Sequence, residues 1–274
     1  MKPTKPEFRR RIKSGEVLLA TMLSLFRNPR WGEILAELDF DFIAIDTEHT
    51  PYSWSEVADL VTALTGHGLP SIVRIPRPSW HYVTKVFDAG AYGVLAPYCE
   101  TVDEAKEVVR AARWRPLKGK FVERVMDEAT FPSEATKTHL QEYNAGHVVI
   151  IGIESVPAVE NLENILDVGD IDAVFVGPAD LSTSMGIPRQ YDRPEFDKMV
   201  RHIIEVCHKR HVPVAANFAP LEQSVKWAGE GISLVIHSVD FRVLREAYHR
   251  ELVEILVAAG RETEQVSREI EREI

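Results

Sequence analysis

Short apolar segments recur eight times along this chain, and each is followed by a stretch with helical periodicity. Most of these segments lack polar alternation, for example residues 148–151, as expected of strands buried on both faces of a parallel sheet. Strand–helix alternation repeated eight times predicts an α/β protein with the (β/α)8 (TIM) barrel fold. The expected strands are residues 17–22, 41–46, 71–75, 92–97, 147–154, 172–177, 212–217 and 232–237.

The chain has the length of one such barrel with an extra C-terminal helix. Its 274 residues slightly exceed the ~250 that α/β barrels commonly use as one domain. We therefore expect a single barrel domain over 1–274, in which 241–274 forms a helical extension used in oligomerisation. Within it, Val266, Ile270 and Ile274 form an apolar stripe at a spacing of four, which predicts a helix that docks on a neighbouring subunit.

Charge and cysteine content restrict the partners and the compartment. Acidic residues outnumber basic ones by 42 to 32, and no cluster of Lys and Arg suggests a nucleic-acid partner. No apolar run approaches the ~18–20 residues of a membrane span. Cys99 and Cys207 lack disulfide or metal-ligand spacing, so we expect a cytoplasmic protein. The basic segment 1–14 is expected to be a solvated first helix.

One segment, residues 115–146, is longer than an ordinary helix-to-strand connection. Residues 134–143 have the pattern of a helix, and residues 119–132 that of a loop. Long connections on barrels serve as lids or as contacts between subunits, and both interpretations remain open.

Active residues of such barrels lie where the strands end, which directs attention to two carboxylates. Glu154 and Asp180 follow adjacent strands and suit a hard divalent cation. Ala179 and Asp180 also begin the next helix, where their backbone N–H groups can bind a small anion such as a substrate carboxylate.

The second and third strands end in a base and a cation. Asp46 and His49 are three residues apart, so the carboxylate is expected to orient the imidazole as a general base. Arg74 is placed to stabilise a developing oxyanion. No lysine lies at a strand end, which disfavours a Schiff-base aldolase, and neither nucleotide-binding glycine motifs nor a Gly-x-Ser-x-Gly element occur.

These residues together resemble a known family. The matching elements, in order from about residue 8 to 247, are Asp46-Thr47-Glu48-His49, Val73-Arg74, Asp88-Ala89-Gly90-Ala91, Glu154 and Gly177-Pro178-Ala179-Asp180-Leu181-Ser182. The chain is similar to the HpcH/HpaI aldolases, which are class II, metal-dependent pyruvate aldolases such as 2-dehydro-3-deoxyglucarate aldolase and 4-hydroxy-2-oxoheptanedioate aldolase.

The resemblance implies a role for each matching position. Glu154 and Asp180 would bind Mg²⁺, Mn²⁺ or Co²⁺, Arg74 would stabilise the pyruvate enolate, and His49 with Asp46 would act as the base. We assign Glu48 and Asp88 to the surroundings of these groups, where they would position Arg74 or His49. The resemblance also implies a homo-oligomer, a trimer or hexamer (homohexamer), with exchanged C-terminal helices.

The expected reaction is reversible cleavage of a 4-hydroxy-2-oxo acid to pyruvate and an aldehyde, with only small-molecule partners. Three departures from the family pattern are expected to border the substrate: Gly152 in place of Gln, the altered segment 114–121, and Ser238 in place of Gly. One alternative is a lyase of the citramalyl-CoA or malyl-CoA type. Such an enzyme needs a basic groove for the CoA phosphates, and residues 113–120 are the candidate. The other is a non-catalytic binder of oxo acids, which Gly152 would favour.

Overall fold

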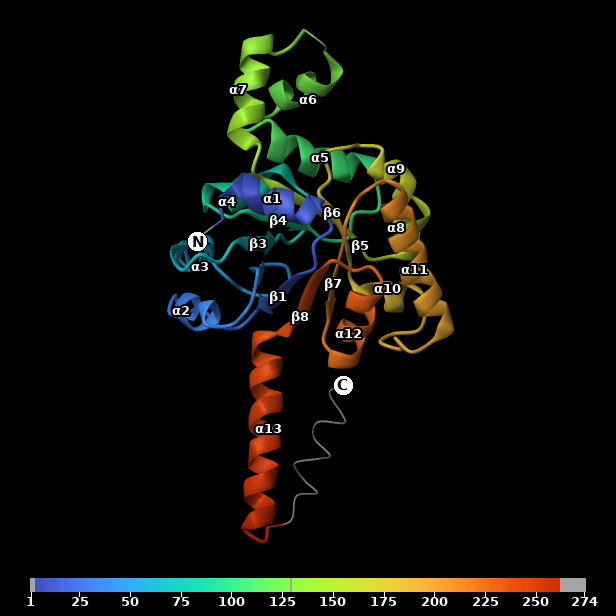
Figure 1. Cartoon of the computed structure of the whole chain (residues 1–274). Helices are drawn as coiled ribbons and strands as arrows, with labels where there is room; N and C mark the ends of the chain where they lie inside the picture. Colours follow the sequence, from blue (N-terminus) through green and yellow to red (C-terminus); the bar gives the residue numbers. More distant parts are fainter. Residues whose placement is uncertain (1–2, 129, 262–274) are drawn as a thin grey trace.

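The computed structural model describes residues 3–128 and 130–261, and these form the expected barrel (Figure 1). Eight parallel strands close on themselves in chain order, so the (β/α)8 prediction is confirmed. Each strand overlaps the segment expected from the sequence. The strands are β1 (Leu18–Leu23), β2 (Phe42–Asp46), β3 (Ser71–Arg74), β4 (Gly93–Ala96), β5 (Val148–Ile153), β6 (Ala173–Val176), β7 (Val214–Phe218) and β8 (Leu234–Val239).

Helices surround the barrel and extend from both of its ends. Those that follow the strands are α2 (Trp31–Ala36), α3 (Trp54–Gly66), α4 (Trp80–Asp88), α5 (Val102–Arg113), α8 (Val156–Glu160), α9 (Leu162–Leu166), α10 (Pro178–Ser184), α11 (Pro194–Lys209), α12 (Leu221–Gly229) and α13 (Asp240–Ala258). The remaining described helices are α1 (Lys5–Lys13), α6 (Lys120–Asp127) and α7 (Glu134–Asn144).

Alternation along the strands divides the core into two layers. One set of side chains, including Phe42, Ile150 and Phe175, fills the inside of the barrel. The other set, including Ile43, Ile151 and Val176, packs between the strands and the helices. Because both sets are apolar, the strands lack polar alternation in the sequence.

Helix α1 plugs the end of the barrel at which the strands begin, here called the closed end. Phe8 and Ile12 are fully buried in the inner core, and the Phe8 ring lies 5.9 Å from Phe42 and 5.8 Å from Tyr92. The expected first helix is confirmed, but it is not fully solvated, because Phe8 and Ile12 are buried. Glu7, Arg10 and Lys13 of this helix are exposed, whereas its buried apolar side chains contribute roughly 1.5–3 kcal/mol each.

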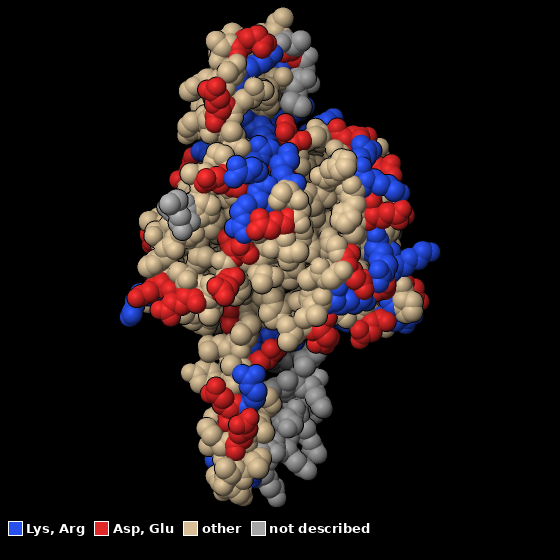
Figure 2. All heavy atoms as spheres, viewed as in Figure 1, with Lys and Arg blue, Asp and Glu red and all other residues tan. Residues whose placement is uncertain are grey.

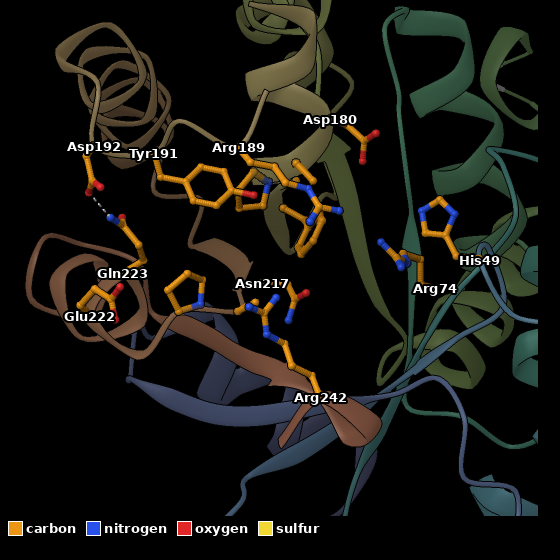
Figure 3. A pocket seen from close by; sticks show the side chains of 16 residues that line it. His49, Arg74, Asp180, Arg189, Tyr191, Asp192, Asn217, Glu222, Gln223 and Arg242 are labelled. Carbon is orange, nitrogen blue, oxygen red and sulfur yellow. Dashed lines mark hydrogen bonds between the residues drawn. The ribbon is translucent and has the colours of Figure 1, made fainter. Parts of the chain in front are cut away.

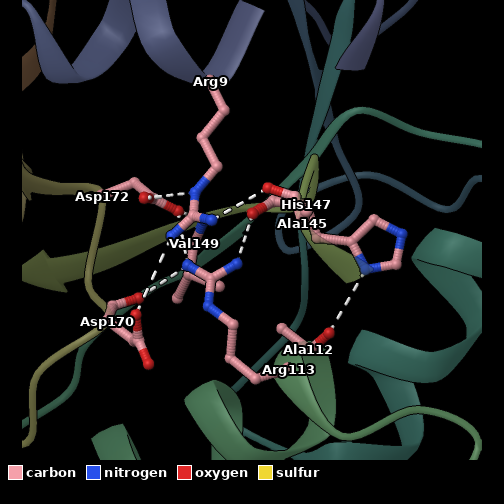
Figure 4. Close-up of polar contacts among 8 residues, drawn as sticks. All are labelled: Arg9, Ala112, Arg113, Ala145, His147, Val149, Asp170 and Asp172. Carbon is pink, nitrogen blue, oxygen red and sulfur yellow. Dashed lines mark hydrogen bonds and ion pairs between the residues drawn. The ribbon is translucent and has the colours of Figure 1, made fainter. Parts of the chain in front are cut away.

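Three charged side chains, Arg9, Arg113 and Asp172, form a closed-end ion cluster beneath the sheet (Figure 4). The fully buried Asp172 accepts hydrogen bonds from Arg9 Nε at 2.7 Å, Arg113 Nη2 at 2.6 Å and the Val149 backbone N–H at 2.9 Å. The cluster therefore joins α1, α5 and β5 to the residue that precedes β6.

The long connection stands away from the barrel at its closed end (Figure 1). Helix α7 matches the expected helix, whereas α6 lies within the segment expected to be a loop. The last turn of this connection meets α1, because a Cβ on Gly146 would lie 2.5 Å from Lys5 Cβ. The segment is thus no lid over the opposite end of its own barrel, and its use as a subunit contact stays a prediction.

Helix α13 extends beyond the barrel at the opposite end from α7 (Figure 1). None of its residues is buried, and its exposed apolar side chains include Phe241, Leu244, Tyr248, Leu252 and Ile255. Figure 2 shows uncharged surface along this helix between acidic and basic side chains. The expected stripe of Val266, Ile270 and Ile274 lies outside the described residues. In the part of the chain that the structure describes, no helix is long and apolar enough to cross a membrane.

Candidate active site

The carboxyl ends of the strands form the mouth of the barrel, and inward-facing positions there carry the polar side chains. Asp46 continues the inward-facing positions of β2, and Arg74 those of β3. The two residues are neighbours in the parallel register, so their side chains project to the same side next to one another. Glu154 continues the inner row of β5 after Val148, Ile150 and Gly152.

Asp46 holds Arg74 rather than His49. Its carboxylate is 2% exposed, and Oδ1 accepts from Arg74 Nε at 2.9 Å and from the Glu48 backbone N–H at 3.0 Å. Burial lowers the pKa of Arg74, but the ion pair with Asp46 more than offsets this, and the guanidinium stays charged. The pair fixes the position of a permanent cation at the mouth.

The predicted Asp46–His49 contact is wrong, because the chain leaves the strand at Asp46 and His49 lies in the loop beyond. The imidazole is 61% exposed, and its Nε2 lies 3.6 Å from Glu48 Oε2. The same Glu48 oxygen lies 3.3 Å from Arg74 Nε. Glu48 therefore lies between Arg74 and His49, the two side chains that it was expected to position, and it is Glu48 rather than Asp46 that lies beside His49.

Glu154 is the most unusual group of the site. It is 1% exposed, and its Oε1 has no hydrogen-bond partner among the described residues. Burial raises the pKa of Glu154 to about 8; Arg74 opposes this shift, and the carboxylates of Glu48 and Asp180 add to it. A buried carboxylate with an oxygen free to accept a ligand and with acidic neighbours suits a divalent cation. The cation would offset the negative charge of the carboxylates.

Two glycines make the space that Glu154 occupies. A Cβ on Gly177 would lie 2.6 Å from Glu154 Cδ, and a Cβ on Gly152 would lie 2.5 Å from Glu154 Oε1. Gly152 therefore borders the carboxylate itself, and a larger residue there would force Glu154 to move. Over residues 3–128 and 130–261, no group of three or more His, Cys, Asp or Glu side chains is arranged to hold a metal, so water and substrate would supply the remaining ligands.

A pocket of about 350 Å³ opens at the mouth (Figure 3). His49, Arg74, Ala179 and Asp180 all line it, so four residues singled out from the sequence share one cavity. Ala179 and Asp180 lie in the first turn of α10, after Pro178 at its start. Their backbone N–H groups belong to the turn whose N–H groups have no partner within the helix.

The order of these elements along the chain matches a known family. The sequence pattern of the HpcH/HpaI aldolase/citrate lyase family matches residues 21–243. The chain belongs to this family. Aldolases and citrate lyases both break carbon–carbon bonds, so the expectation of a carbon–carbon lyase is confirmed.

Individual HpcH/HpaI proteins are similar over most of the chain. The 2-keto-3-deoxy-L-rhamnonate aldolase of Escherichia coli O17:K52:H18 is 29% identical over 250 residues, which cover 89% of this chain and 91% of that protein. An HpcH/HpaI aldolase from Desulfitobacterium hafniense DCB-2 is 28% identical, with a TM-score of 0.79 over 90% of this chain and 96% of that one. The citrate synthase SbnG is 26% identical, with a TM-score of 0.74 over 92% of this chain and 96% of that one.

Asp88 and the segment 114–121 were both expected near the substrate, but in a single chain neither lies at the mouth of the barrel. Asp88 ends α4 at the closed end, where it is exposed and paired with Arg115, so it does not reach Arg74 or His49. The altered segment 114–121 lies at the same end and does not border the mouth of its own barrel. Arg113 is buried in the closed-end ion cluster, which removes it from the candidate CoA groove.

The pocket of this HpcH/HpaI protein also contains residues that the sequence analysis missed. Arg189, Tyr191, Asn217 and Arg242 line it. Asn217 lies near the end of the seventh expected strand, so the strand-end rule could have found it. Arg189 and Tyr191 follow α10 rather than a strand, and Arg242 lies in the first turn of α13 just after β8; none of the three belongs to a recognisable motif.

Proposed function

We propose that this chain is a divalent-metal-dependent aldolase that reversibly cleaves a 4-hydroxy-2-oxo acid to pyruvate and an aldehyde. The observation that carries the proposal is Glu154, a buried carboxylate whose Oε1 has no hydrogen-bond partner among the described residues, within electrostatic reach of Arg74 and Asp180. Glu154 and Asp180 would hold Mg²⁺, Mn²⁺ or Co²⁺. When bound, the cation supplies Lewis-acid polarisation of the 2-oxo group and charge for the substrate carboxylate.

The side chains at the mouth of the barrel carry out the proton transfer and stabilise the enolate. His49 removes the proton of the 4-hydroxyl group, the C3–C4 bond breaks, and its electron pair forms the enolate of pyruvate while C4 becomes the aldehyde carbonyl. Arg74, fixed by Asp46, stabilises the negative charge on the enolate oxygen. A proton from solvent then adds to C3 of the enolate to give pyruvate, and His49 returns to solvent the proton it removed. The N–H groups of Ala179 and Asp180, in the first turn of α10, would bind the substrate carboxylate.

Deuterium exchange into pyruvate tests the proposal without knowledge of the aldehyde. The protein is stripped with EDTA, incubated with pyruvate in D₂O, and the methyl signal is followed by NMR. We expect no exchange without metal and exchange after addition of Mg²⁺, Mn²⁺ or Co²⁺. Metal-replete protein that never exchanges these protons would contradict the enolate mechanism and favour a non-catalytic oxo-acid binder.

Substitution of His49 tests its assignment as the base. His49→Gln is expected to lower kcat for aldol cleavage by about 10²–10⁴-fold, the usual contribution of a general base. Glu48→Gln should have a smaller effect, about tenfold, because Glu48 acts by orienting its neighbours. Steady-state rates of pyruvate release measure both. A His49→Gln enzyme within threefold of wild type would show that another group is the base.

We also propose that α13 joins this chain to further copies of itself, in a trimer or hexamer. The support is its row of exposed apolar side chains, which a single chain leaves in water. The double variant Tyr248→Lys/Leu252→Lys is expected to shift the mass measured by light scattering to that of one chain, with an unchanged circular dichroism spectrum. A wild-type protein that is already monomeric would refute this assembly.

The cytoplasmic setting also remains a proposal. Both cysteines, Cys99 and Cys207, are free and buried, as suits a reducing compartment.

A further inference from the structure

His49 depends on its loop for its position, because its side chain is held only weakly. The imidazole is 61% exposed, and its contact with Glu48 Oε2 is 3.6 Å long. Its place at the edge of the pocket (Figure 3) is therefore set by the backbone of residues 47–52, which follow β2 and are here called the His49 loop. What fixes this loop matters for catalysis, because a misplacement of ~1 Å in a reacting group can cost about 100-fold in rate.

The first half of the His49 loop is tied to the sheet. The Thr47 hydroxyl donates to the Arg74 carbonyl at 2.6 Å, and the Thr50 hydroxyl donates to the Asp46 carbonyl. Asp46 ends β2 and Arg74 ends β3, so both bonds lead back to the strands that carry the Asp46–Arg74 pair. They hold the loop where it leaves the sheet.

The second half of the loop is tied to a different part of the mouth through Tyr52. Its hydroxyl donates to the Phe26 carbonyl at 3.0 Å. Phe26 belongs to residues 24–26, which directly follow β1 and are here called the β1 segment. The next residue, Arg27, lies 5.4 Å from the centre of the Tyr52 ring and pairs with Glu56 of α3 at 3.1 Å. These contacts hold the β1 segment beside the His49 loop.

Asp240 holds the β1 segment from its other side. Its Oδ2 accepts hydrogen bonds from the consecutive backbone N–H groups of Ser24 at 3.1 Å, Leu25 at 2.9 Å and Phe26 at 2.9 Å. Successive N–H groups that converge on one anion form a nest, and hydrogen bonds to a charged acceptor are roughly twice as strong as neutral ones. Asp240 is the first residue of α13, so the nest fastens the β1 segment to the end of β8.

The two contacts meet at one residue. Asp240 accepts from the N–H of Phe26, and Tyr52 donates to the carbonyl of the same residue. Burial raises the pKa of the Tyr52 hydroxyl, and the charge of Asp240 adds to this shift, so the hydroxyl stays protonated and remains a donor at neutral pH. A continuous path of contacts therefore runs from the end of β8, through the β1 segment, to the loop that carries His49.

We propose that Tyr52 and Asp240 are positioning residues of the reaction. They hold the β1 segment against the His49 loop and so keep the imidazole where it can reach the 4-hydroxyl group of the substrate. Both act through His49 rather than on the substrate itself. This inference rests on the proposed function, which makes His49 the base.

Tyr52→Phe tests the first contact, because it removes the hydroxyl and keeps the ring. The assay is cleavage of the aldol adduct of pyruvate with acetaldehyde, propanal or glycolaldehyde, whichever wild type cleaves fastest. We expect kcat to fall by about 3- to 10-fold, the effect of one hydrogen bond, with KM within about twofold of wild type. Tyr92→Phe is the matched control. The Tyr92 hydroxyl donates to the Pro3 carbonyl at the same distance of 3.0 Å at the closed end, so its loss should lower stability comparably and leave kcat unchanged.

Substitution of Asp240 tests the second contact. Asp240→Ala leaves the N–H groups of the β1 segment without their acceptor, and we expect kcat to fall by about tenfold or more. Asp240→Asn keeps an oxygen that can accept and should retain an intermediate rate, and it tests the contact even where the alanine variant does not fold. Light scattering checks that the variants keep the mass of wild type, since Asp240 begins α13.

Combination with His49→Gln shows whether the effect passes through His49. If Tyr52 acts by placing the imidazole, Tyr52→Phe should change kcat by less than about twofold once His49 is replaced, because effects that act through one group are not additive. Pyruvate exchange is the second readout. It should keep the wild-type rate in Tyr52→Phe and Asp240→Asn, because the proposed mechanism does not use His49 for proton transfer at C3. An equal loss in both backgrounds, or a parallel loss of exchange, would indicate a general structural role and overturn the inference.

The inference and the proposed function fail in different ways. Absence of exchange in metal-loaded wild type would overturn the proposed function and the inference with it. Wild type may not be spared in that case, whereas a second pattern leaves the aldolase intact. In that pattern wild type exchanges, His49→Gln lowers kcat, and Tyr52→Phe and Asp240→Ala both stay at the rate of wild type. That result would overturn the inference alone.

Discussion

Glu154→Gln is expected to lower kcat/KM for aldol cleavage by at least about 10³-fold, the scale of a lost Lewis-acid contribution of several kcal/mol. The amide keeps the size of the side chain but removes the charge that would hold the cation next to Asp180. Glu160→Gln, in the exposed part of α8 just beyond, is the matched control and should be unaffected. Steady-state rates at saturating Mg²⁺, Mn²⁺ and Co²⁺ measure the effect. A variant that retains a tenth of wild-type activity would remove Glu154 from the metal site.

The same substitution should stabilise the metal-free protein. The folded-state pKa of Glu154 is about 8, against an ordinary value of 4.5. Between pH 4.5 and pH 8, Glu154 is therefore protonated in the native state and ionised in the unfolded chain. Because the native state binds more protons, the free energy of unfolding falls as pH rises through this range. A difference of this size corresponds to a loss on the order of 3–5 kcal/mol.

Urea unfolding at pH 5, 6, 7 and 8 in EDTA checks this result. Wild type and Glu160→Gln should lose stability across the series, whereas Glu154→Gln should change less and be the more stable protein at pH 8. Added divalent metal should restore stability to wild type alone, because binding to the native state stabilises it by mass action. Identical pH profiles for wild type and Glu154→Gln would contradict the expectation.

Asp172→Asn should reduce the free energy of unfolding by about 3–5 kcal/mol, because it leaves the guanidinium groups of Arg9 and Arg113 near the closed end without their shared carboxylate. The neighbouring Asp170 provides a matched control: it is 67% exposed and lies 3.9 Å from Arg9. Asp170→Asn should cost less than about 1 kcal/mol, as is usual for exposed pairs.

Urea denaturation measures both variants, and pyruvate exchange provides the second readout. Asp172 lies at the opposite end of the barrel from the reacting groups, so the exchange rate of folded Asp172→Asn protein should equal that of wild type. Equal losses of stability in the two variants would show that burial of Asp172 adds nothing to the cluster.

The sequence predicted the barrel because its strands are buried on both faces. That burial forces apolar residues at consecutive positions such as Val148 and Val149, a pattern that depends little on tertiary detail. The strand-end rule also placed Arg74, Glu154 and Asp180 correctly at the mouth, because the fold brings all carboxyl ends of the strands to one edge.

The sequence did not show in the same way which side chains pair with each other at the mouth of the barrel. Asp46 pairs with Arg74 because the register of β2 and β3 places them side by side, and register is not visible in a single strand. Asp88 was misplaced because its motif lies where a helix ends rather than where a strand ends. Arg189 and Arg242 are brought together only by the loop after α10 and the first turn of α13.

The plug formed by α1 has a consequence for synthesis on the ribosome. Arg9 and its partner Asp172 are separated by 163 residues. At a synthesis rate of ~5–20 residues per second, roughly 10–30 s pass between the appearance of the two. During that interval Phe8 and Ile12 belong to a nascent segment whose binding surface is incomplete. Helix α1 is thus synthesised well before the residue that completes its ion cluster, and chaperones that bind exposed apolar segments have a defined period in which to act on it.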